Sequence, residues 1–168
     1  MWKGYYTATK GDKQMKYSVI GFAKCGTVSL QKYLTNKGHD ATKNEHPVYW
    51  TKEKQDDFLK DRQPIVITRD RAEALWSFYQ YFGYHKLKLP YEEFFTLKIK
   101  ANNFLNLTPI EIYDYDRWIL PNYEVIRYEE LIKDPEFPHE NKTRNKTEIP
   151  YQFKDAVRRL YVVNTQTV

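Results

Sequence analysis

Apolar and polar positions alternate along this chain in a way that pairs short strands with amphipathic helices. An apolar run begins at Tyr17, passes through a glycine-containing turn and continues as an amphipathic stretch to Leu34, which predicts a strand followed by a helix. A second apolar run over 64–68 also leads into a helical stretch. This alternation predicts an α/β fold with three layers, in which helices cover a central, mostly parallel sheet.

The later part of the chain continues the same order. The polar connection over 37–50 has room for a short strand, and residues 123–127 predict a further strand. Thr108 followed by proline indicates a helix start, with threonine as the cap and proline in the first turn. Helices are expected at 51–60, 91–99, 108–120 and 151–163.

The segment 128–135 follows the strand at 123–127 and is expected to be structural, with Leu131 and Ile132 at core positions. We find no internal repeat, low-complexity stretch or linker. With 168 residues the chain suits one domain, and we expect a single domain over 1–168.

The turn after the first strand has the composition of a phosphate-binding loop. Gly21 and Gly26 allow the backbone to turn tightly, Lys24 supplies a positive charge, and the first amides of the following helix favour an anion. The turn is not a Walker A loop, because Gly26 is followed directly by Thr27 and the lysine precedes the glycine. The candidate phosphate-binding residues of this turn are Lys24, Cys25, Gly26, Thr27, Val28 and Ser29.

A second motif follows the strand at 64–68. Arg69 comes directly after the strand, and Ser77 lies eight residues later in the predicted helix. A guanidinium offers a planar fork of donors to a phosphate, and a serine hydroxyl two turns along the helix adds another donor. Asp70 and Glu73 have the spacing of a capping box, which places the start of this helix.

Together, the two motifs resemble the sulfotransferases that use 3′-phosphoadenosine 5′-phosphosulfate (PAPS). The segment from Lys24 to Ser29 is similar to their 5′-phosphosulfate loop, and Arg69 with Ser77 matches the arginine and serine that hold the 3′-phosphate. The resemblance, closest in pattern to the carbohydrate and heparan-type enzymes, implies a sulfotransferase fold related to P-loop NTPases. It also implies PAPS as cosubstrate, 3′,5′-diphosphoadenosine (PAP) as product, a hydroxyl acceptor such as a carbohydrate, and no metal.

The resemblance further implies a base shortly after the first helix. Glu45 lies 21 residues after Lys24 and is the preferred candidate, with His46 as the alternative because an imidazole titrates near neutrality. A late basic loop in this family adds contacts to the 3′-phosphate, which makes Lys142 and Arg144 candidates by position and charge.

The chain departs from the family pattern at three positions. Val28 stands where many members carry a second threonine, so backbone amides would have to replace one hydroxyl contact. Ala23 and Arg71 stand where prolines are frequent beside the two motifs.

Composition adds limits to this interpretation. The net charge of +5 favours anionic partners such as a nucleotide or an acidic acceptor, and we expect no nucleic acid. The single cysteine, Cys25, excludes an internal disulfide, and no apolar run has signal-peptide or membrane-spanning length. A cytoplasmic protein is therefore expected, and its oligomeric state stays undecided.

Two other functions stay open at this point. A nucleotide kinase with an altered P-loop would need a serine or threonine after Gly-Lys to hold Mg²⁺, and this chain has none there. A non-catalytic module that binds a nucleotide or polyanion would keep the basic residues and lack the base.

Overall fold

The computed structural model describes residues 13–22, 24–45, 52–99, 106–119, 123–138 and 148–166. The chain divides into two units. One contains residues 1–68 and 119–140, and the other contains residues 69–118 and 141–168.

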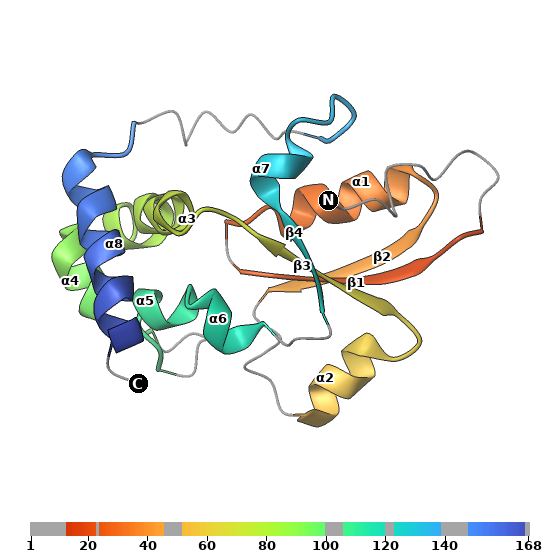
Figure 1. Cartoon of the computed structure of the whole chain (residues 1–168), viewed down its shortest axis with the longest axis horizontal. Helices are drawn as coiled ribbons and strands as arrows, with labels where there is room; N and C mark the ends of the chain where they lie inside the picture. Colours follow the sequence, from red (N-terminus) through yellow and green to blue (C-terminus); the bar gives the residue numbers. More distant parts are fainter. Residues whose placement is uncertain are drawn as a thin grey trace. The chain divides into compact units, whose positions relative to one another are not determined.

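The first unit is built on a parallel sheet of four strands, as Figure 1 shows. The strands lie in the order β2-β1-β3-β4, and all three neighbouring pairs are parallel. The α/β class and the parallel sheet are thereby confirmed. The strands are β1 (Lys16–Gly21), β2 (Asp40–Glu45), β3 (Gln63–Thr68) and β4 (Glu124–Arg127).

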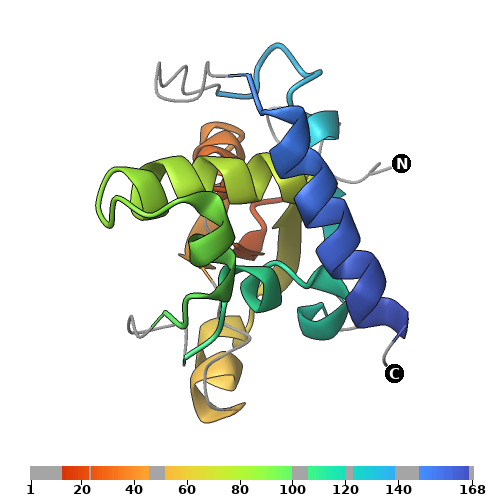
Figure 2. The same ribbon diagram turned by 90° about the vertical axis from the view of Figure 1, so that its left-hand side faces the viewer.

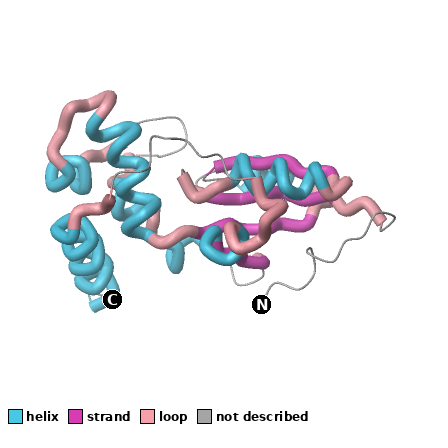
Figure 3. The backbone as a smooth tube through the Cα atoms, turned by 90° about the horizontal axis from the view of Figure 1, so that it is seen from above, coloured by secondary structure: helices cyan, strands magenta, loops and turns pink. Residues whose placement is uncertain are grey.

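The strand order contains a point at which the direction of winding reverses. From β1 the chain moves to β2 on one side, and it then returns to place β3 on the other side of β1. Figure 3 shows the strands, in magenta, running alongside one another. In open parallel sheets, ligands bind beyond the carboxyl ends of the strands at such a reversal. The loop after β1 begins at this point.

Helices lie against both faces of the sheet. Tyr17 and Val19 belong to the buried cluster that includes residues of α1 (Thr27–Asn36). Between them, the Ser18 hydroxyl donates to the carbonyl of Phe58 in α2 (Lys52–Leu59) at 2.8 Å. Successive side chains of a strand point to opposite faces, so α1 packs on one face and α2 approaches the other at Ser18.

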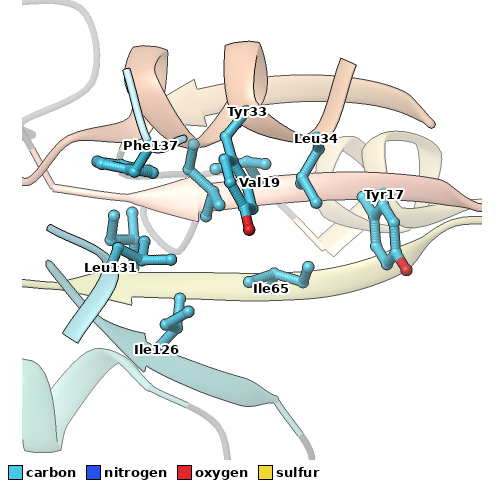
Figure 4. Packing of buried hydrophobic residues seen from close by; sticks show 10 residues of the cluster. Tyr17, Val19, Tyr33, Leu34, Ile65, Ile126, Leu131 and Phe137 are labelled. Atoms are coloured by element: carbon cyan, nitrogen blue, oxygen red, sulfur yellow. The ribbon is translucent and has the colours of Figure 1, made fainter. Parts of the chain in front are cut away.

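The core of the first unit lies between α1 and the sheet (Figure 4). Leu34 of α1 is fully buried, together with Ile65 of β3. The short helix α7 (Tyr128–Leu131) contributes Leu131. The polar strand β2 pairs with β1 alone, and this edge position tolerates its polar sequence.

The second unit is helical, as Figure 2 shows, and aromatic side chains pack together within it. Trp76 and Tyr79 lie 5.7 Å apart between ring centroids, and Phe153 lies 4.9 Å from Trp76. Its elements are α3 (Arg71–Phe78), a π-helix η2 (Tyr79–Tyr84), α4 (Tyr91–Thr96), α5 (Pro109–Ile112), α6 (Tyr115–Trp118) and α8 (Tyr151–Gln166).

Most element positions agree with the sequence predictions, and three details were wrong. The helix expected over 91–99 ends at Thr96, because Leu97 is extended and Ile99 forms an antiparallel bridge with Leu107. Ile132, expected in the core, is 38% exposed, since α7 ends at Leu131 and turns its next residue outward.

The helix expected over 108–120 was the third error. Thr108 does cap its start, because its hydroxyl accepts a hydrogen bond from the amide of Glu111. The helix then ends at Ile112, and α6 begins only at Tyr115. Tyr113, between them, is fully buried with its ring 6.0 Å from Phe78, so tertiary packing interrupts the helix.

Candidate functional site

The turn between β1 and α1 has a left-handed backbone at two positions. Lys24 has φ of 65° and Gly26 has φ of 95°. Between them, Cys25 is fully buried and its amide donates to the carbonyl of Phe22 at 3.1 Å. Left-handed residues directly before a helix occur in anion-binding turns, where the first helix amides face the ligand. The turn is compatible with a phosphate-binding loop.

Two glycines are needed for this geometry. A Cβ atom at Gly21 would lie 2.2 Å from Cγ2 of Thr27, so only glycine lets α1 start so close to β1. A Cβ atom at Gly26 would lie 2.9 Å from the ring of Tyr128 and 3.4 Å from Ile67. The loop is thus held against both β3 and α7.

The amino terminus of α1 differs from that of α3 in how it is capped. Gly26 is the N-cap of α1 and has no side chain to accept a hydrogen bond from the first turn. In α3, the Asp70 carboxylate is the N-cap and accepts from the amide of Glu73 at 3.0 Å. The α1 terminus is suited to an external anion, while α3 already carries its own.

The predicted loop residues occupy different environments. Thr27 is buried with 2% of its surface exposed, whereas Val28 is 45% exposed at the start of α1. Lys24, Gly26 and Ser29 are partly exposed. A ligand at this turn would meet the Lys24 side chain and the helix amides, with the Thr27 side chain packed beneath them.

The preferred base candidate lies at the same edge of the sheet. Glu45 is the last residue of β2, and its Cα pairs in register with Gly21 at the end of β1. The structure describes its backbone only. His46, the alternative base, lies outside the described residues, as do Lys142 and Arg144.

Arg69 and Ser77 belong to the second unit. Arg69 follows the last residue of β3 in sequence, and its Nε lies 3.4 Å from the Glu73 carboxylate, one helical turn further on. Its side chain is 18% exposed. Ser77 is 5% exposed on α3. The motif therefore combines a partly accessible guanidinium just before α3 with a buried serine on that helix.

Two aromatic residues at these motifs were missed by the sequence analysis. Tyr128 packs on Gly26, whereas the sequence analysis predicted only a structural role for the segment 128–135 that contains it. Tyr115 donates a hydrogen bond from its hydroxyl to the carbonyl of Arg69 at 2.7 Å. The position of Tyr128 directly after β4 was a usable signal, since loops after parallel strands form ligand sites. No local signal pointed to Tyr115.

No model of a protein family matches this chain, and no curated protein is significantly similar to it in sequence. Among the helices that the structure describes, none has the length and apolar character needed to cross a membrane. Any functional assignment therefore depends on the two motifs and their geometry.

Proposed function

We propose that this protein is a sulfotransferase that moves a sulfuryl group from PAPS to an acceptor hydroxyl, with a carbohydrate as the expected acceptor class. The fold proposed with it is the P-loop-like fold of that family, in which helices and a central parallel sheet form three layers. The observation that carries the proposal is the left-handed turn at Lys24 and Gly26, which joins β1 to α1 where the winding of the sheet reverses.

The turn offers what a 5′-phosphosulfate group needs. The uncapped first turn of α1 supplies amide donors and the positive end of a helix dipole. Lys24 adds a positive charge to the same turn. As the bond to sulfur breaks, negative charge grows on the bridging oxygen, and the Lys24 ammonium would stabilise that charge. Such transfers gain most from in-line positioning and charge stabilisation.

Arg69 and Ser77 would hold the 3′-phosphate. The guanidinium of Arg69 contacts the Glu73 carboxylate at 3.4 Å. A phosphate offers a bidentate, charge-assisted interaction, which is stronger than a partly exposed carboxylate contact. This part of the proposal predicts discrimination between nucleotides with and without a 3′-phosphate.

Glu45 is proposed as the base that takes the proton of the acceptor hydroxyl. Its backbone position beside Gly21 supports this choice, because the acceptor must approach the sulfuryl group from the end of the sheet that carries the loop. His46 is the alternative, since it follows directly in the chain. Lys142 and Arg144 are proposed as further contacts to the 3′-phosphate.

A binding experiment tests the nucleotide part. Calorimetry should show that PAP binds more tightly than 5′-AMP by about 2–4 kcal/mol, because loss of the 3′-phosphate leaves a charge-assisted fork without its partner. Arg69→Ala should remove the preference without unfolding the protein. Equal affinities for PAP and 5′-AMP would contradict the proposal, and tighter binding of ATP than of PAP would favour a nucleotide kinase.

A turnover experiment tests the chemistry. With labelled PAPS and a panel of carbohydrate acceptors, Glu45→Gln should lower turnover by roughly 10²- to 10⁴-fold and leave PAP affinity nearly unchanged. Lys24→Ala should lower both. His46→Ala is the matched control, because loss of turnover in that variant alone would assign the base to the histidine. Tight PAP binding with no acceptor sulfated would indicate a non-catalytic binding module.

A further inference from the structure

The main chain at Arg69 is held by a side chain from another part of the second unit. The Tyr115 hydroxyl, at the start of α6, donates to the Arg69 carbonyl at 2.7 Å, a distance typical of an O–H···O hydrogen bond. Arg69 itself lies between the end of β3 and the start of α3, outside any regular element. The Tyr115 contact therefore restrains the backbone that carries the Arg69 guanidinium.

Tyr115 is one of three side chains that stack on one another, the other two being Arg71 and Tyr161. The guanidinium carbon of Arg71 lies 5.3 Å from the Tyr115 ring centroid and 4.3 Å from that of Tyr161. Arg71 also pairs with the carboxylate of Asp116 at 3.3 Å. A planar guanidinium stacks on aromatic faces better than an ammonium does. Arg71 thus links the first turn of α3 to α6 and α8.

The far end of the stack is anchored. Tyr161 of α8 is 7% exposed, and its hydroxyl donates to the carbonyl of Ile110 in α5 at 2.9 Å. Burial raises the pKa of Tyr161 far above its ordinary value, although the nearby Arg71 guanidinium opposes the shift. The phenol therefore stays a neutral donor over the whole working range of pH.

We propose that Tyr115 and Arg71 are positioning residues that hold Arg69 ready for the 3′-phosphate. This inference rests on the proposed function. Arg71 occupies the first position of α3, and its stack fixes the turn in which Arg69 lies. Without the stack, the Arg69 guanidinium samples more orientations. Its conformational entropy is then lost when the anion binds, which weakens binding.

The test uses Tyr115→Phe, which keeps the ring over Arg71 and removes the hydrogen bond to Arg69. PAP affinity should fall roughly three- to tenfold, the range expected for one hydrogen bond, while 5′-AMP affinity stays unchanged. Tyr79→Phe is the matched control, because its hydroxyl also donates to a carbonyl of the same unit, that of Leu89, at 2.8 Å. That variant should leave the ratio of the two affinities unchanged.

A second measurement needs no nucleotide. In ¹⁵N-correlated spectra of the free protein, the Nε–Hε signal of Arg69 can be assigned by its loss in Arg69→Lys. It should be sharp in the wild type and in Tyr79→Phe, and broadened or shifted toward the free value in Tyr115→Phe. Arg71→Lys, which keeps the charge but loses the planar stack, should have the same effect as Tyr115→Phe.

The outcomes separate this inference from the proposed function. A wild-type preference for PAP that persists unchanged in Tyr115→Phe overturns the positioning role and leaves the function standing. If the wild type shows no preference, the 3′-phosphate assignment fails. The Arg69 signal then decides whether Tyr115 and Arg71 order the Arg69 guanidinium, since a signal unaffected by Tyr115→Phe contradicts that role and a broadened one supports it.

Discussion

Replacing Gly26 by alanine tests whether the loop depends on its contact with Tyr128. Gly26 has φ of 95°, a conformation that costs an L-residue about 1–2 kcal/mol. The added Cβ would also lie 2.9 Å and 3.2 Å from two ring atoms of Tyr128. Overpacking of this kind costs about 1–3 kcal/mol. The free energy of unfolding should therefore fall by about 2–5 kcal/mol, a large part of a typical domain's stability.

Gly38 provides the matched control within the same unit. Its φ is 90°, and a Cβ added there meets nothing within 4 Å. Gly38→Ala should therefore cost only the backbone strain of about 1–2 kcal/mol. The difference between the two variants isolates the steric contact with Tyr128.

Urea denaturation followed by circular dichroism gives both free energies. In a double-mutant cycle, Tyr128→Ala should remove the steric part of the Gly26→Ala penalty, so that the double variant is more stable than the two single effects predict. Equal penalties for Gly26→Ala and Gly38→Ala, with no coupling to Tyr128, would refute the idea that this ring holds the loop.

Two further predictions concern stability. Tyr33→Phe removes the 2.7 Å hydrogen bond from the Tyr33 hydroxyl to the Asp134 carboxylate. This hydrogen bond is the largest of the effects that lower the pKa of Asp134. Because that pKa is depressed in the folded state, the stabilisation is present above the unfolded value near ~3.9 and is lost as pH falls through the folded value. In denaturation experiments, the free energy of unfolding of Tyr33→Phe should be about 1–2 kcal/mol below that of the wild type at pH 6, and the difference should shrink toward pH 2. A difference that does not change with pH would contradict this explanation. Asp70→Ala should lower the free energy of unfolding by about 1 kcal/mol, because the N-cap of α3 is lost. Asp70→Asn should lower it much less, since asparagine is also a good N-cap, and thermal unfolding of both variants measures the difference.

Local signals predicted much of the fold. The strand and helix on either side of the turn at Lys24 were expected from periodicity alone, and the starts of α3 and α5 followed from Asp70 and Thr108. These features depend on residues within one or two turns of each other, so a linear sequence displays them. The left-handed backbone at Gly26 was likewise foreseeable, because glycine is the residue that adopts it without strain.

The candidate site was only partly predictable. The sequence displayed the two motifs that contain Lys24 and Arg69. It could not indicate which distant side chains would hold those motifs in place. Tyr128 reaches Gly26 across about a hundred residues of chain, and Tyr115 reaches Arg69 across 46. Such contacts have no periodicity to reveal them, since they arise when separate elements pack together.

The sequence by itself determined the element types, the glycine turn and the parallel character of the sheet, because these follow from local conformational preference and from the alternation of strands and helices. Only the tertiary structure decided the strand order and the break at Tyr113 within the expected helix. It also decided the stacking of Arg71 between two tyrosine rings. Each of these features depends on packing between residues distant in sequence, and the free energy of that packing exists only once the chain has folded.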